Sequence, residues 1–161
     1  MIVVSDTSPF INLAALDRLT LLRDLYDRIL VSQAVSDEII ASAVLRPGAT
    51  EVGDLGWAST RQVSHHVLAA SLRLELDEGE AEAIALAIEL KADLLLLDER
   101  KGRMIASRLG LRGTGLLGLL IEAKQRGLIA EVKPLMDSLI VKAGFWIGQV
   151  LYDRVLKVAG E

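Results

Sequence analysis

Four carboxylates are the residues whose type and placement point to chemistry. Asp6 directly follows the apolar run Ile2 to Ser5, and Asp98 directly follows the leucine run 94–97. Glu38 and Glu80 lie in segments with helical periodicity. Carboxylates crowded together raise one another's pKa, whereas a divalent cation lets them stay ionised. If the four side chains meet, the sequence predicts a metal site that activates water for hydrolysis of a phosphodiester.

Three of these carboxylates also have a simple structural interpretation. Asp6 precedes Thr7 and Ser8, whose hydroxyls can orient a metal ligand, but an aspartate at this place is also a common helix cap or turn former. Asp98 fits an ordinary turn at the end of a strand. Glu38 lies at the margin of the apolar arc of its helix, where a solvated acid fits equally well. The local sequence leaves both interpretations open.

Glu80 lies in a segment that begins at Asp77 and has the pattern of a capping box, in which the glutamate reaches back to the helix start. On a helical wheel at about 100° per residue, Glu80 falls on the same side as Ile84 and Ala87. Glu82 and Glu89 fall on the opposite, solvated side. Because a carboxylate directed toward the core needs a partner, the pattern favours Glu80 over Glu82 as a site residue.

The composition limits the metals and compartments that suit this chain. It has no cysteine and only two histidines, which excludes disulfides, zinc–thiolate sites and thiol nucleophiles. Oxygen ligands favour Mg2+ or Mn2+. No uncharged apolar run approaches the roughly 18 residues of a membrane span, and no leader-like segment follows Met1. We therefore predict a cytoplasmic protein with no membrane partner.

Hydrophobic periodicity predicts strands that alternate with helices. The expected strands cover 2–5, 28–31, 57–63, 94–97 and 111–113. The expected helices follow the leucine spacing from Leu13 to Leu22 and then cover 33–42, 77–90, 101–109, 116–126, 132–142 and 149–158, with a break at Arg46-Pro47-Gly48.

This alternation implies a single α/β domain over 1–161, with a core at about 1–126 and a helical extension at 127–161. We expect three layers, α/β/α, around a central and mainly parallel sheet. Ligands of such sheets bind beyond the carboxyl ends of the strands, where Asp6 and Asp98 both fall.

The net charge of −4 means that any binding of nucleic acid must rest on local features. Arg100, Lys101 and Arg103 follow Asp98 closely and are candidates for steering a phosphate backbone toward the metal. The adjacent pair His65 and His66 cannot chelate one metal in the usual i, i+4 manner, so we expect surface or packing roles. The glycine-rich segment 113–118 lacks a Walker lysine and fits a tight turn with close packing.

The ordered motifs resemble a PIN domain. They are Val3-Val4-Ser5-Asp6-Thr7-Ser8-Pro9, Leu76 to Ala87 with its Gly-Glu-Ala-Glu-Ala stretch, and Ala92 to Asp98. The likeness covers about 1–126 and is strongest to the prokaryotic toxin-like branch, similar to VapC-type ribonucleases and to stand-alone members of unsettled function.

The resemblance implies that Asp6, Glu38, Glu80 and Asp98 bind Mg2+ or Mn2+ and hydrolyse single-stranded RNA, with Thr7 or Ser8 in support. It also implies a homodimer and a small antitoxin that is encoded beside the chain. The strand before Asp98 is all leucine and lacks the helper hydroxyl of many toxin members. The alternative is a weak or inactive PIN scaffold that binds RNA or a partner protein without cutting; a small-molecule enzyme lacks a nucleotide loop or nucleophile.

Overall fold

The computed structural model describes residues 1–45 and 48–161. Its centre is a five-stranded, wholly parallel sheet in the order β3-β2-β1-β4-β5. The strands are β1 (Val3–Ser5), β2 (Ile29–Ser32), β3 (Ala58–Arg61), β4 (Leu94–Leu96) and β5 (Gly113–Thr114). The expected break after the second helix lies partly at Arg46 and Pro47, outside the described residues.

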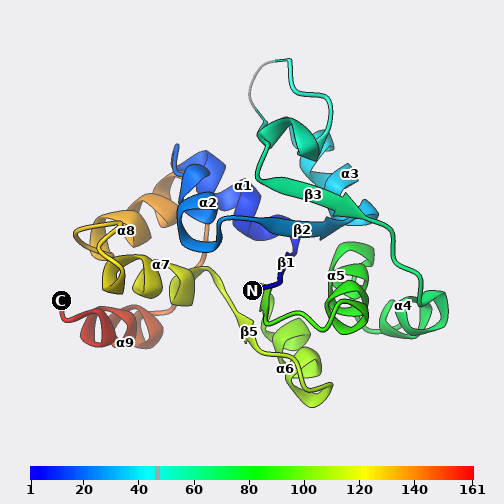
Figure 1. The fold of residues 1–161 in the computed structure, drawn as a ribbon. Coiled ribbons are helices and arrows are strands. Elements are labelled where there is room, and N and C mark those ends of the chain that lie inside the picture. The colour runs from blue at the N-terminus through cyan, green and yellow to red at the C-terminus, as the bar shows by residue number, and fades with distance from the viewer. Residues whose placement is uncertain (46–47) are drawn as a thin grey trace.

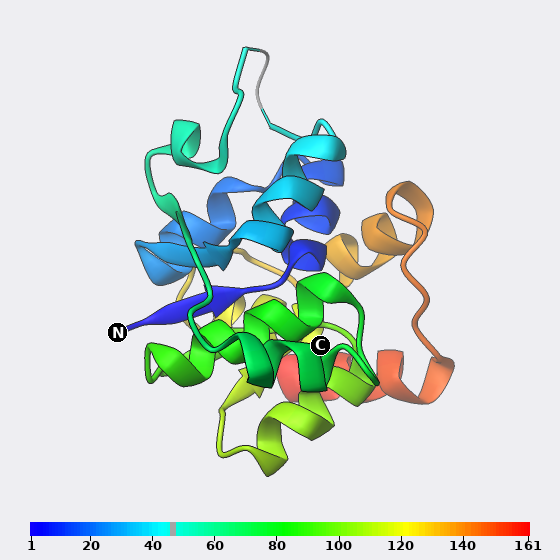
Figure 2. The same ribbon diagram turned by 90° about the vertical axis from the view of Figure 1, so that its right-hand side faces the viewer.

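Helices fill the connections between the strands, as the sequence predicted. They are α1 (Thr7–Ala15), α2 (Thr20–Tyr26), α3 (Gln33–Ala41), the 3-10 helix η1 (Val52–Leu55), α4 (His66–Leu72), α5 (Glu78–Glu89), α6 (Arg100–Arg108), α7 (Leu116–Gln125), α8 (Lys133–Lys142) and α9 (Gln149–Ala159). Figure 2 shows α1, α2 and α3 on one side of β1 and α5 on the other. The expected three-layer α/β/α architecture is therefore confirmed.

The central strands are held by burial on both faces. Leu95 and Leu97 are fully buried, and β4 pairs with β1 so that Val3, Val4 and Ser5 stand opposite Leu94, Leu95 and Leu96. An all-leucine strand suits this position because a central parallel strand is covered by helices above and below. This register places Asp6 and Asp98 just beyond the carboxyl ends of two adjacent strands.

The last three helices gather at the side of the fold opposite α4 (Figure 1). Helix α8 packs on α1, and α7 packs on α9. Within the described residues, no helix is both long and apolar enough to cross a membrane.

The short strand β5 lies later than the sequence predicted, at 113–114 instead of 111–113. Leu111 is used to end α6: its backbone N–H donates to Ala106 O at 3.0 Å, and Gly110 adopts a φ of +83°. A helix that ends through a left-handed glycine takes up the backbone donors of the residues just after it. The strand therefore begins only after this turn.

Candidate active site

Asp6 lies at the centre of the carboxyl edge of the sheet. Its backbone N–H donates to Leu96 O at 2.9 Å, which ties the end of β1 to β4. Asp6 holds the N-cap position of α1, yet its side chain makes no capping hydrogen bond, and the residue is only 7% exposed. The cap interpretation of the sequence therefore describes the backbone of Asp6 but not its carboxylate.

The charges of other carboxylates raise the pKa of Asp6. The pKa of Asp6 is raised from 3.8 to about 7. Burial is the largest cause, the Thr7 backbone N–H acts in the opposite direction, and the charges of Asp77, Glu80 and Glu38 add to the rise. A buried acid surrounded by like charges favours its neutral form until a cation arrives. Two of the acids predicted from sequence thus lie close enough to affect the third.

Glu38 is held in place from two sides. The hydroxyl of Thr7 donates a hydrogen bond to Glu38 Oε2. The backbone of Gly79 lies against the same carboxylate, since a Cβ at that position would stand 2.7 Å from Glu38 Oε1 and 2.9 Å from Oε2. Glu38, which the sequence left as a solvated helix acid or a ligand, is therefore fixed beside the start of α5.

We expect Gly79→Ala to displace the Glu38 carboxylate while the fold is kept. Alanine suits the first turn of a helix, and the group it displaces is the free end of a flexible side chain. If Glu38 supports function, affinity for Mn2+ should fall about tenfold, as it does when supporting groups of a metal site are changed. Gly53→Ala is the matched control because its Cβ would meet Glu51 Oε1 at an ordinary 3.5 Å. Equal Mn2+ affinity in both variants would contradict a role for Glu38.

Glu80 combines the two roles that the sequence left open. Asp77 caps α5 by accepting from Glu80 N–H at 2.8 Å, and Glu80 Oε2 accepts from Asp77 N–H at 3.4 Å. Glu80 is also half-buried, and burial, followed by the charge of Asp77, raises its pKa. The charge of Glu99, the N-cap of α6, raises this pKa as well.

Asp98 is fixed by the starts of two helices, α1 and α7. Its Oδ2 accepts from Ser8 Oγ at 3.2 Å, and its Oδ1 accepts from Leu116 N–H at 3.1 Å. The second bond places a negative charge at the N-terminus of α7, where the helix dipole favours it. Gly115 lets both side chains approach the backbone closely, because a Cβ there would stand 3.0 Å from Asp98 Oδ1 and 2.8 Å from Arg103 Nη1.

The three cations behind Asp98 differ in position. Arg100 and Lys101 are exposed in the first turn of α6. Arg103 is half-buried, and its Nη1 donates to the carbonyl oxygens of Leu97 and Asp98. Arg103 therefore stabilises the end of β4, a role that the sequence gave no sign of.

Two acids expected on the solvated face of α5 are instead half-buried. Glu82 Oε1 accepts from Ala34 N–H at 3.2 Å in the first turn of α3, and Glu89 Oε1 accepts from Ser64 N–H at 2.7 Å. The wheel failed here because it takes no account of neighbouring helices, and α3 and α4 both pack on α5. Glu82 remains separate from the acids around Asp6.

The oxygen donors around Asp6 fit a hard divalent cation in their chemistry. Such an ion would stabilise the ionised form of Asp6, which burial and the neighbouring negative charges destabilise. Within residues 1–45 and 48–161, however, no three acidic or histidine side chains already stand together at coordinating positions. The charges of Glu38 and Glu80 raise the pKa of Asp6, whereas the charge of Asp98 is not among its causes. Glu38, Glu80 and Asp98 each also hold a structural hydrogen bond.

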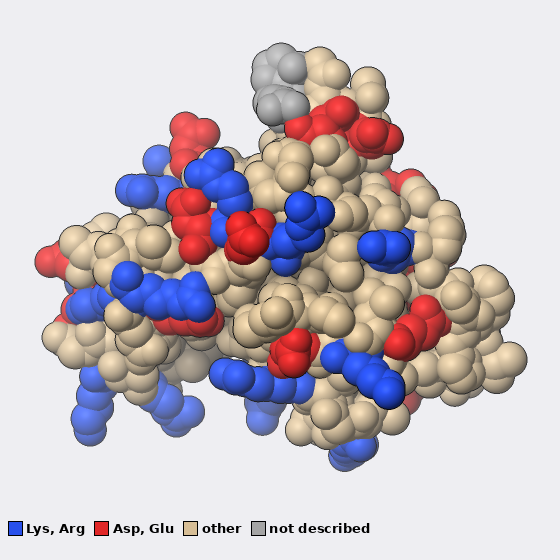
Figure 3. Space-filling model, viewed as in Figure 1, with Lys and Arg blue, Asp and Glu red and all other residues tan. Residues whose placement is uncertain are grey.

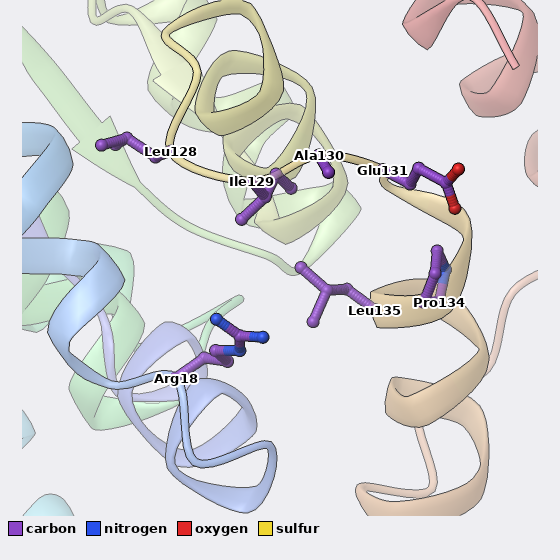
Figure 4. Close-up of a pocket in the computed structure, with 7 residues that line it drawn as sticks. All are labelled: Arg18, Leu128, Ile129, Ala130, Glu131, Pro134 and Leu135. Carbon is purple, nitrogen blue, oxygen red and sulfur yellow. The ribbon is translucent and has the colours of Figure 1, made fainter.

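Other features of the described surface do not contribute to this group. His65 and His66 are exposed, and His65 Nδ1 caps α4 by accepting from Leu68 N–H, as expected of surface residues. A hollow of about 330 Å³ lies between Arg18, the loop 128–131 and the start of α8 (Figure 4). It contains none of the predicted site residues.

The comparison with known families agrees with this geometry. The family model described as a PIN domain matches residues 2–161. The chain belongs to the PIN domain family. PIN domains are generally nucleases that use divalent metals and act on RNA. No curated protein matches the chain.

Asp77 and Glu99 are the acids of this PIN domain that sequence reasoning missed. Both precede helices and accept hydrogen bonds from backbone N–H groups, Asp77 from Glu80 and Glu99 from Gly102. Their capping patterns were readable in the sequence, but a cap pattern does not show which way the cap faces. Their charges reach the site because α5 and α6 both start at the same edge of the sheet.

Proposed function

We propose that this PIN domain is a metal-dependent endoribonuclease that hydrolyses phosphodiester bonds of single-stranded RNA. The observation that carries the proposal is the buried Asp6, whose pKa is raised by its burial and by three neighbouring carboxylates. Asp6, Glu38, Glu80 and Asp98 would hold Mg2+ or Mn2+. Such an ion, when bound, supplies an activated water for attack on phosphorus and stabilises the leaving oxygen.

The residues of the chain itself would position this chemistry. Thr7 orients Glu38, and Ser8 orients Asp98, so consecutive hydroxyls of α1 hold acids on either side of Asp6. The N-terminus of α7 fixes the other oxygen of Asp98. Arg100 and Lys101, exposed beside Asp98, would attract the phosphate backbone.

The test is cleavage of a labelled single-stranded RNA by the purified chain with Mn2+, with Mg2+ and with EDTA. Glu80→Gln keeps the capping box, because glutamine can replace glutamate at this position. We expect this variant to lose about tenfold or more in rate through the lost charge. Glu78→Gln, in the same helical turn, is the matched control and should cleave normally. Cleavage that persists in EDTA, or that is equal in both variants, would contradict the proposal.

A specific observation favours a second candidate function, a scaffold that binds RNA or a partner protein without cutting it. Glu38, Glu80 and Asp98 are each engaged by a hydrogen bond, and no metal group is preassembled among the described residues. RNA that is bound but left intact with Mn2+ would support the scaffold.

We also propose that the protein is the toxin of a toxin–antitoxin pair and forms a homodimer in the cytoplasm. The support is the likeness of its motifs to the toxin branch of the family. The proposal predicts a small DNA-binding protein encoded in the neighbouring reading frame, which should suppress RNA cleavage when the two proteins are mixed. Growth unaffected by expression of the chain alone would count against it.

A further inference from the structure

A groove leads from the acidic site toward the last helix. Asp98 lines this hollow of about 680 Å³ together with Trp146, Leu151 and Val158. Its lining residues come from the start of α6, from β5 and α7, and from α9 with the segment before it. Figure 1 shows α7 and α9 on one side of β5 and α6 on the other. Its volume falls within the roughly 300–1,000 Å³ typical of binding clefts.

The charged groups of the groove are mostly cations. Arg100, Arg103 and Arg154 line it, and Asp98 is the single acid among its lining residues. Figure 3 shows basic side chains projecting along the lower edge of the molecule, over α9 and α6, while the rest of this face carries both signs. In a chain of net charge −4, this local excess of arginine is suited to a polyanion.

An exposed aromatic ring completes the groove. Trp146 is 85% exposed, although tryptophan is costly to leave in water. The backbone of Gly148 supports one part of the ring, since a Cβ there would stand 3.2 Å from Trp146 Cη2. Exposed aromatic rings next to arginines are the standard platform on which proteins stack single-stranded bases.

We propose that this groove binds the single-stranded nucleic acid substrate, with Trp146 stacking on a base and with Arg154 and Arg100 contacting phosphates. The inference rests on the proposed function and names the positioning residues for it. A strand lying in the groove would pass Asp98 and so present its backbone to the acids around Asp6. A protein partner is a poorer fit, because an apolar partner would leave the arginines without counter-charges.

The experiment measures binding without cleavage. A labelled decauridylate is titrated against the chain in EDTA, by anisotropy and by quenching of tryptophan emission. Trp57 stacks on the buried Phe10 with ring centroids 5.8 Å apart, so the quenched signal should come from Trp146. Trp146→Ala should weaken binding roughly tenfold, and Trp146→Phe should restore most of the affinity.

Arg154→Gln should weaken binding, and it should reduce the slope of the logarithm of the binding constant against the logarithm of the salt concentration by about one. Two variants are the controls and should bind normally. Leu74→Ala changes an equally exposed apolar residue, and Arg28→Gln changes a residue just before β2, at the amino ends of the strands. Unchanged affinity in Trp146→Ala would overturn the inference. A shift of Trp146→Ala from dimer to monomer, with no quenching of the wild type, would also overturn it and assign the groove to a second copy.

The outcomes separate the two proposals. RNA bound through Trp146 but left uncut with Mn2+ would refute the nuclease and keep the groove. RNA cut by a Trp146→Ala variant of normal affinity would refute the groove and keep the nuclease.

Discussion

Asp6→Asn should make the metal-free protein more stable at pH 8, by up to about 4 kcal/mol. The folded state raises the pKa of Asp6 from 3.8 to about 7. Between these values the folded chain holds a proton that the unfolded chain releases, so stability falls as pH rises through this window. Asparagine carries no charge at any of these pH values and removes the penalty.

Urea unfolding at pH 5, 6, 7 and 8, in EDTA, measures the effect. The wild type should lose stability as pH rises, and Asp6→Asn should show a much flatter profile, with a residual slope from Glu80, whose pKa is also raised. Asp153→Asn, an exposed aspartate on α9, is the matched control and should follow the wild type. Parallel profiles for the wild type and Asp6→Asn would show that Asp6 is not destabilised by its neighbours.

The same substitution should lower RNA cleavage by at least about a hundredfold. A divalent cation contributes several kcal/mol of charge stabilisation in the transition state, and each 1.36 kcal/mol corresponds to about a factor of ten in rate. The charges of three other acids raise the pKa of Asp6. Its loss should therefore weaken binding of the ion more than the loss of Glu80. Single-turnover rates with saturating Mn2+ measure the difference.

If Asp6→Asn is more stable than the wild type and yet inactive, the loss of activity has a cause other than unfolding. Residual cleavage within about tenfold of the wild type would indicate that the reaction does not pass through Asp6 or that the activity belongs to a contaminant.

Much of the fold could be predicted because local patterns and tertiary demands agree. The leucine run 94–97 predicted a strand buried on both faces, and β4 has all its residues buried. The Asp77–Glu80 pattern predicted a capping box, which the structure contains. The alternation of strands and helices was sufficient to place Asp6 and Asp98 at one edge of a parallel sheet.

The rest depended on neighbours that no local pattern encodes. Glu82 was expected in solvent but accepts from Ala34 N–H in the first turn of α3. Arg103 was expected to steer a phosphate, and the structure adds hydrogen bonds from its Nη1 to the carbonyl oxygens at the end of β4. The hydrogen bond from Thr7 to Glu38 joins residues that lie far apart in the sequence. A helical wheel gives the direction of a side chain, but only packing decides what that side chain meets.

Calorimetric titration of Mn2+ into the wild type and Asp6→Asn at pH 7 tests whether the acids around Asp6 form a cation site. Asp6 has a pKa of about 7, so the wild type should bind the ion and release a fraction of a proton, seen as a heat that changes with the ionisation enthalpy of the buffer. Asp6→Asn should bind at least about tenfold more weakly and release no proton from this site. Equal affinity and equal proton release in the two proteins, or no binding to the wild type, would show that these acids do not form a cation site.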